Sequence, residues 1–203
     1  MKKLHKEALD IEEYILPPID VNTRNLCNHI NRYSTAMIDL NININDSILD
    51  ASCGTGYGTY FISDKVKCVT GIDINNKFLA IARKNFSKSN IEFIHYNDLG
   101  SKIFDKIVCI ETIEHMGEEY QEIFIDKLLN HLKENGDMYI TTPLGNDKQS
   151  DYNLYHLNEL SLNTLHGMFK KKFRTITFEI YLYKNSYDKE KECVNVILKG
   201  YKR

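Results

Sequence analysis

Residues 47–58 read SILDASCGTGYG and join a strand-like apolar run to a glycine-rich turn. A short apolar run ends on Asp50 and leads at once into a turn that contains Gly54 and Gly56. Glycine permits positive φ and has no Cβ atom, so a ligand can approach the backbone N–H groups of such a turn. The N-terminus of the helix that follows favours a negative group such as a carboxylate. The stretch therefore predicts a strand, a ligand-binding turn and a helix, which together form the first unit of an α/β sheet.

Taken alone, this turn has more than one explanation. A dinucleotide-binding fingerprint needs a third glycine at position 59, where the chain has Thr59, so the G-x-G-x-x-G interpretation is weak. A purely structural strand-to-helix connection also fits the same residues. The neighbouring strands must decide between these alternatives.

Outward from the turn, short apolar runs alternate with segments of helical periodicity, which indicates repeated βα units and a parallel sheet. Strands are expected near 48–49, 68–72, 91–94, 106–110 and 137–142, the last entered through Asn135-Gly136, and helices near 57–62, 78–86, 118–133 and 158–169. Two alternating segments, 173–183 and 193–201, predict an antiparallel hairpin. The expected fold is α/β: a Rossmann-like seven-stranded sheet, mostly parallel, with an antiparallel C-terminal hairpin and helices on both faces.

The N-terminal region reads as two helices ahead of the sheet. Residues 2–16 predict a short helix that stops at Pro17-Pro18, because proline cannot continue it. Residues 22–40 predict a second helix, whose apolar face carries Leu26, Ile30, Tyr33 and Met37. We expect residues 1–40 to form a helical lid and residues 41–203 to form the core of a single-domain protein.

Composition narrows the classes of partner. The 203 residues include 26 Lys and Arg against 28 Asp and Glu, so we expect neither a nucleic-acid nor a membrane-surface partner. The basic run at 170–172 follows a predicted helix, and we interpret it as a solvated turn. Five scattered cysteines suggest neither a disulfide framework nor a zinc site. The chain has no signal-peptide-like start and no long apolar run, so the expected location is the cytoplasm.

Two further acids follow neighbouring strands. Asp73 ends the run VTGID and is placed to accept hydrogen bonds from both ribose hydroxyls of a nucleoside. The alternative is that Asp73 only caps a helix beginning near Asn75. Asp98 follows the next strand and is placed to accept from an adenine amino group, or else it is a solvated loop acid.

The order of these motifs, over residues 22–203, resembles that of class I methyltransferases, whose cofactor is S-adenosylmethionine and whose product is S-adenosylhomocysteine. The resemblance implies that Gly54 and Gly56 hold the methionine part, that Asp73 holds the ribose and that Asp98 lies beside the adenine. The commonest pattern in this family has glycine where this chain has Ser52, a departure that concerns local backbone geometry.

Within that class the chain is most similar to small methyltransferases encoded with glycan-assembly enzymes. The similarity rests on His29, on Arg32-Tyr33, on the turn at 50–58, and on ETIEH at 111–115, TTP at 141–143 and YHLNEL at 155–160. It implies O-methylation of a sugar, nucleotide-sugar or glycan hydroxyl. Alternatives are another small acceptor, such as a sugar amine, a quinone or a phosphorus-containing group, and a catalytically silent cofactor-binding scaffold.

These inferences define the expected site. His115 and His156 are the candidates for the catalytic base that takes the acceptor proton. His115 alternatively bonds backbone near the loop after strand four, and His156 alternatively only enters a helix. Glu111 and Glu114 alternatively face the cofactor's ammonium group or the acceptor, or form an acidic turn favoured at a helix start. No metal is expected. The expected cofactor-binding residues are Tyr33, Asp50, Ser52, Cys53, Gly54, Gly56, Asp73, Ile74, Asp98, Leu99 and Glu111.

Overall fold

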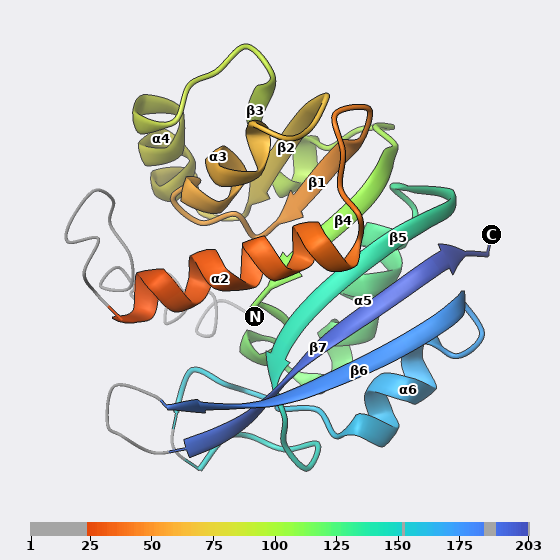
Figure 1. Ribbon diagram of the computed structural model, residues 1–203. Coiled ribbons are helices and arrows are strands. Elements are labelled where there is room, and N and C mark those ends of the chain that lie inside the picture. The colour runs from red at the N-terminus through yellow and green to blue at the C-terminus, as the bar shows by residue number, and fades with distance from the viewer. Residues whose placement is uncertain (1–23, 152, 185–189, 203) are drawn as a thin grey trace.

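The computed structural model describes residues 24–151, 153–184 and 190–202 and contains one seven-stranded sheet (Figure 1). The strands are β1 Ser47–Ala51, β2 Cys68–Asp73, β3 Ile91–His95, β4 Phe104–Ile110, β5 Leu132–Pro143, β6 Phe173–Lys184 and β7 Glu190–Tyr201. Their order in the sheet is β3-β2-β1-β4-β5-β7-β6. Strands β1 to β5 pair in parallel, and β7 lies antiparallel between β5 and β6. The predicted sheet, with its closing hairpin, is confirmed.

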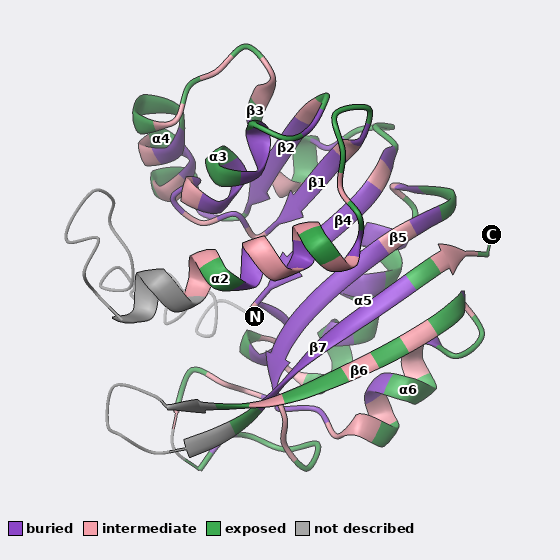
Figure 2. Ribbon diagram, viewed as in Figure 1, coloured by how far each residue is buried: buried purple, intermediate pink, exposed green. Residues whose placement is uncertain are grey.

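Helices cover both faces of this sheet. They are α2 Arg24–Asp39, α3 Tyr57–Ser63, α4 Asn76–Asn85, α5 Glu118–Leu129 and α6 Leu162–Phe169. Figure 1 shows α2 crossing in front of the sheet, with α5 and α6 behind it. Each face has its own apolar cluster, one built with α2 and α3 and the other with α5 and α6. The central strands are buried in Figure 2, whereas β6 at the edge is largely exposed.

Helix α2 packs directly on the sheet. Tyr33 and Ala36 of this helix, and Leu40 directly after it, are buried in the cluster that contains Ile48 and Val108. The predicted apolar face of this helix is therefore confirmed at Tyr33, which is buried, and at Met37, which is partly buried. The side chain of Leu26 lies outside the described residues. The predicted helix at 2–16 also lies outside them.

A buried lysine fastens the end of α2 to the sheet. The Nζ atom of Lys106 on β4 donates to the backbone oxygens of Leu40 at 2.7 Å and Asn41 at 2.9 Å. The same atom lies 3.0 Å from Oδ2 of Asp46. Because α2 carries Arg32 and Tyr33, this attachment also sets the position of two side chains of the candidate site.

The boundary between α5 and β5 differs from the prediction. The helix expected over 118–133 ends at Leu129, and the strand expected over 137–142 begins at Leu132. Leu132 pairs with Phe104 and Asp137 pairs with Lys106, so β5 bulges between these two pairs. Asn135 takes a positive φ of 64° in this bulge. The Asn135-Gly136 pair is thus a bulge inside the strand and not the turn that enters it.

The last helix is also shorter than predicted. It was expected over 158–169 and begins at Leu162, because the side chain of Ser161 caps it by accepting from the backbone N–H of Thr164 at 3.2 Å. The connection from β5 to α6 therefore runs over residues 144–161, of which all but residue 152 are described. Within the described part of the chain, no helix is long and apolar enough to cross a membrane.

Candidate functional site

The glycine-rich turn joins β1 to α3 at the carboxyl edge of the sheet. Ser52, Gly54 and Gly56 all have positive φ, at 63°, 55° and 90°. Among the described residues, no atom lies within 4 Å of the place where a Cβ on Gly54 would stand. A Cβ on Gly56 would instead lie 2.8 Å from the ring of Phe93. Gly54 therefore faces open space that a ligand can fill, whereas Gly56 is required for packing.

Asp50 is fully buried beneath this turn. Its Oδ1 accepts from the hydroxyl of Tyr33 at 3.1 Å, and its Oδ2 accepts from the hydroxyl of Thr59 at 2.6 Å. Burial raises the pKa of Asp50 to about 7, although both hydrogen bonds oppose the rise. Position 59, where a dinucleotide fingerprint would have its third glycine, instead has Thr59, whose hydroxyl donates a hydrogen bond to the buried Asp50.

Asp73 connects the end of β2 to the glycine turn. Its Oδ2 accepts from the backbone N–H of Gly54 at 2.9 Å and its Oδ1 from that of Asn75 at 2.8 Å. The cap of α4 is Asn75, whose side chain accepts from the N–H groups of Lys77 and Phe78. The alternative in which Asp73 only caps that helix is therefore wrong. Burial raises the pKa of Asp73, while these N–H groups oppose the rise by stabilising its charged form.

The other residues expected near the adenine lie in different surroundings. The side chain of Ile74 is about half exposed beside Asp73, and Asp98 is exposed in a short 3-10 turn after β3. Leu99 is buried in the apolar cluster on the α5 side, so its side chain belongs to the core. Cys53 is also buried, in a small cluster with Phe93.

A second part of the candidate site contains an ion pair between buried Arg32 and partly buried Glu111. The guanidinium of Arg32 on α2 lies 3.2 Å from Oε2 of Glu111, and its Nε donates to the hydroxyl of Tyr181 on β6 at 3.2 Å. Glu111 follows β4 with a φ of 47°, a conformation that costs a non-glycine residue about 1 kcal/mol or more. Its Oε1 is buried and has no hydrogen-bond partner in the described part of the chain. Burial and the charge of Arg32 lower the pKa of the neighbouring His29 to about 4.

The two candidate catalytic histidines meet next to this pair. The ring centroids of His115 and His156 are 5.0 Å apart, in an edge-to-face arrangement. His115 Nδ1 lies 3.0 Å from the backbone oxygen of Tyr155, and His156 Nδ1 lies 2.6 Å from Oε1 of Glu159. Desolvation and the adjacent His156 lower the pKa of His115.

Glu114 is the third side chain of this group. It is only 1% exposed, and its Oε2 accepts from the hydroxyl of Thr142 at 3.2 Å. Burial and the nearby carboxylate of Glu111 raise the pKa of Glu114 well above its ordinary value. One ligand atom from each of Glu114, His115 and His156 lies within 4.8 Å of the others.

The loop 144–161 brings His156 to this place. Gln121 on α5 donates from Nε2 to the backbone oxygens of Ile113 and Asn158, both at 2.8 Å. The side chain of Asn158 returns a hydrogen bond to Oε1 of Gln121 at 2.8 Å, and its N–H donates to the backbone oxygen of Glu114. This buried amide pair ties the loop to the segment after β4.

The structure thus brings most of the expected residues to one edge. Strands β1 and β4 are neighbours, with Ala51 paired to Cys109, so the glycine turn and the segment at 111–115 leave the sheet side by side. Sequence reasoning missed Tyr181 and Glu159 as partners of Arg32 and His156. The signal for Glu159 was its position three residues after His156.

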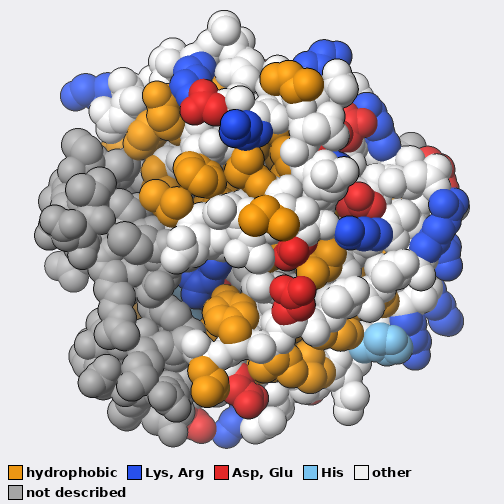
Figure 3. All heavy atoms as spheres, viewed as in Figure 1, with side chains coloured by type: hydrophobic (Ala, Val, Ile, Leu, Met, Phe, Trp, Pro, Cys, Tyr) orange, Lys and Arg blue, Asp and Glu red, His pale blue; other side chains and the backbone are white. Residues whose placement is uncertain are grey.

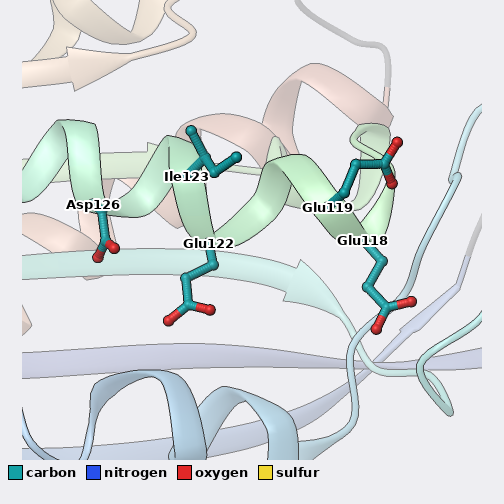
Figure 4. Close-up of a pocket in the computed structure, with 5 residues that line it drawn as sticks. All are labelled: Glu118, Glu119, Glu122, Ile123 and Asp126. Atoms are coloured by element: carbon teal, nitrogen blue, oxygen red, sulfur yellow. The ribbon is translucent and has the colours of Figure 1, made fainter.

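Two charged surface features lie apart from this set. Figure 3 shows Lys and Arg side chains gathered along one edge near the C-terminal end, with mixed charges elsewhere on that face. In the run at 170–172, Lys172 lies 2.5 Å from Asp126 and 3.6 Å from Glu122 of α5. Glu122 and Asp126 also line a surface depression of about 550 Å³ along α5, together with Glu118, Glu119 and Ile123 (Figure 4). These contacts are those of a solvated helix surface.

Comparison with known proteins agrees with this geometry. Residues 48–136 match the family model described as a methyltransferase domain. This part of the chain is therefore similar to a methyltransferase domain. The matched segment runs from β1 into β5 and includes the glycine turn, Asp73 and residues 111–115.

Individual relatives of the methyltransferase domain differ in what they act on. The ubiquinone biosynthesis O-methyltransferase of Rickettsia akari is 36% identical over 101 residues, which are 47% of this chain and 39% of that protein. This chain thus spans about two fifths of that relative's length. The N-methyltransferase NodS from Bradyrhizobium japonicum, crystallised with S-adenosyl-L-homocysteine, is 17% identical, with a TM-score of 0.70 over 96% of this chain and 97% of its own. The [4+2]-cyclase SpnF is 13% identical, with a TM-score of 0.66 over 84% and 81%. These two structures show the shared fold.

Proposed function

We propose that the protein transfers a methyl group from S-adenosylmethionine to a hydroxyl oxygen of a small acceptor, namely a sugar, a nucleotide sugar or a glycan. The observation that supports this most is the link between Asp73 and the N–H of Gly54, 2.9 Å long. It fixes an acid that can accept from a ribose diol beside a turn that is open to a ligand.

The residues present fit this cofactor. Open space over Gly54 leaves room for the methionine part, and Asp73 is held by two backbone donors with its carboxylate ready to accept further hydrogen bonds. The exposed part of Ile74 offers an apolar surface for the adenine, with Asp98 as an acceptor for its amino group. When bound, the cofactor supplies an electrophilic methyl group on a sulfonium. The full set of cofactor residues expected from the sequence is part of this proposal.

His115 and His156 are our proposed catalytic pair at the acceptor. In each imidazole Nδ1 faces an oxygen that can only accept, so Nδ1 carries the proton and Nε2 presents its lone pair. That lone pair is suited to receive the proton that the acceptor hydroxyl loses. We expect His156 to be nearer the acceptor, because Leu154 and Tyr155 beside it are exposed apolar side chains, 80% and 43% accessible.

Support for the acceptor class comes from two sources. The Rickettsia akari relative is named an O-methyltransferase, which favours oxygen as the methylated atom. The sugar is supported by the resemblance to glycan-associated methyltransferases in the segments 111–115 and 155–160. The relative's name also makes a ring hydroxyl of a quinone precursor the second candidate, and the exposed Tyr155 suits either kind of ring.

The proposal extends to organisation and place of action. We propose that residues 1–40 form a lid over the core at 41–203, since Arg32 and Tyr33 of α2 contact Glu111 and Asp50. We also propose that the protein acts in the cytoplasm. The described cysteines Cys53, Cys68, Cys109 and Cys193 form no disulfide, which is compatible with that compartment.

Calorimetric titration with S-adenosylmethionine, S-adenosylhomocysteine and NAD tests the cofactor. We expect binding of the first two, and at least 10-fold weaker binding in Asp73→Asn, which keeps the shape of the side chain but lowers its acceptor capacity. Asp64→Asn, an exposed acid elsewhere, is the matched control and should leave affinity unchanged. Tight binding of NAD with no response to the other two ligands would overturn the proposal.

Turnover tests the acceptor and the alternative of a silent scaffold. Formation of S-adenosylhomocysteine is followed with nucleotide sugars, free deoxysugars, amino sugars and catechols as acceptors. His115→Ala and His156→Ala should retain cofactor affinity and lose most turnover. If the protein binds the cofactor but forms no product with any acceptor, the result would favour the alternative of a catalytically silent cofactor-binding scaffold.

A further inference from the structure

A compact group of three potential ligand atoms lies beside the proposed acceptor position. Glu114, His115 and His156 come from two segments about 40 residues apart, and one ligand atom from each lies within 4.8 Å of the others. Such a spacing allows all three atoms to reach one ion at bond lengths of about 2.0–2.2 Å after small side-chain adjustments.

Both imidazoles are already oriented as metal ligands usually are. A ligating histidine generally donates its other ring N–H to a carboxylate or a backbone oxygen, which fixes the ring and its tautomer. Here His156 Nδ1 faces Glu159 at 2.6 Å, and His115 Nδ1 faces the backbone oxygen of Tyr155 at 3.0 Å. In both rings, therefore, Nε2 presents its lone pair.

The third member has an unpaired oxygen. Oε1 of Glu114 is buried and has no hydrogen-bond partner among the residues that the structure describes, while Oε2 is held by Thr142. Leaving a carboxylate oxygen buried and unpaired is costly, and such groups are ordinarily paired or bound to a metal. A cation at this place would give the oxygen its missing partner.

We propose that Glu114, His115 and His156 together bind one divalent cation of the first-row transition series. Two imidazoles and a carboxylate suit zinc, manganese, iron or cobalt better than the all-oxygen sites that magnesium or calcium prefer. The three protein ligands leave coordination positions open, which is the arrangement of catalytic rather than structural metal sites. The amide pair between Gln121 and Asn158 holds the two ligand-bearing segments together in advance.

The role that we assign to the ion rests on the proposed function. An acceptor hydroxyl that binds the ion loses its proton more easily, as water does when bound to zinc. The hydroxyl oxygen then forms a bond to the methyl carbon, and the carbon–sulfur bond breaks with its electron pair remaining on sulfur. The products are a methyl ether, a neutral thioether and one proton released to solvent. In this form of the reaction the two histidines hold the ion and do not act as the base.

Binding is tested without cofactor or acceptor, so the result is independent of the proposed function. Tag-free, chelator-treated protein is titrated with manganese chloride and with zinc chloride by calorimetry. We expect one ion per chain, with affinity reduced at least 10-fold in His115→Ala and in His156→Ala. Glu159→Gln, which keeps the size but weakens the partner of His156, should reduce affinity about 10-fold. His166→Ala, in α6, is the matched control and should bind as the unaltered protein does.

Circular dichroism on each variant confirms that it folds. Absence of saturable binding of both ions, or binding that survives both histidine substitutions in folded protein, would overturn the proposed site. Once an acceptor is known, turnover adds a second readout. A metal role predicts loss of turnover with a chelator and recovery with added manganese or zinc, whereas turnover that resists the chelator would show that the histidines act alone.

Discussion

Replacing Asp50 by Asn should change how the stability of the protein depends on pH. Burial raises the pKa of this carboxyl from 3.8 to about 7 in the folded chain. Between these two values the folded protein binds more protons than the unfolded chain does, so the free energy of unfolding falls as pH rises. The stability that protonated Asp50 contributes is fully present below pH 4 and is lost as pH rises toward 7.

The structure sets the size of this effect. A pKa that rises from 3.8 to about 7 corresponds to about 4 kcal/mol between acid and neutral pH, at 1.36 kcal/mol for each unit of pKa. The amide introduced by Asp50→Asn cannot accept from both Tyr33 and Thr59 as the carboxylate does, and the loss of one hydrogen bond costs about 1 kcal/mol. We therefore expect Asp50→Asn to be about 3 kcal/mol more stable than the unaltered protein at pH 8 and within about 1 kcal/mol of it near pH 5.

Urea unfolding of the ligand-free protein at several pH values from 5 to 8 measures this difference. Asp98→Asn removes an exposed carboxyl in the turn after β3 and serves as the control, with a pH profile parallel to that of the unaltered protein. A free energy of unfolding of Asp50→Asn that differs from that of the unaltered protein by the same amount at every pH would contradict this prediction. That outcome would mean that the ionised carboxylate is accommodated as well in the folded chain as in water.

Three further substitutions test the packing that positions the site, each by denaturant unfolding. Ser52→Val should lower the free energy of unfolding by about 2 kcal/mol, because a β-branched residue strongly disfavours the φ of 63° at this position, whereas Ser52→Gly should stay within about 1 kcal/mol of the unaltered protein. Equal effects of the two changes would show that the backbone here is not constrained. Gly58→Ala should cost about 1–3 kcal/mol, since its Cβ would stand 2.1 Å from Cζ of Tyr33; a neutral result would mean that this ring is free to move. Lys106→Met should cost about 3–5 kcal/mol, because it leaves Asp46 and two backbone oxygens of the α2 end without their buried cation; a cost below about 1 kcal/mol would contradict this role.

The fold could be predicted largely from local patterns. Each βα unit carries its own signal, since the apolar run of a buried strand and the periodicity of the next helix are contiguous in sequence. Two boundaries of helices and strands could not be predicted in this way, because they depend on contacts that are not visible in the local pattern. The bulge at Asn135 depends on the register between β5 and β4, and the start of α6 depends on the cap at Ser161. Neither position breaks the hydrophobic pattern around it.

The two halves of the candidate site differ in the same way. The half that we propose for the cofactor consists of a strand end, a turn and the next strand end, and its Asp73–Gly54 contact joins residues only 19 positions apart. The acceptor half depends on contacts that the topology creates between distant segments. Arg32 and Tyr181 are 149 positions apart, and His115 meets the backbone of Tyr155 across 40 positions. Sequence could name His115 and His156 as candidates, but their contact required the loop at 144–161 to be placed.

Because the proposed acceptor half depends on long-range contacts, its chemistry can be described only from the structure. The βα turn at residues 50–58 is one contiguous segment, whereas the second half combines residues from α2, from the segment after β4 and from the loop at 144–161. Glu111 and Glu114 together place two carboxyl groups in this interior, and Arg32 supplies one compensating charge at 3.2 Å from Glu111. Each acid keeps one buried oxygen unpaired within the described chain. Two such oxygens beside two oriented imidazoles suit positively charged or hydrogen-donating ligands. The proposed cofactor, acceptor hydroxyl and divalent cation all meet that description.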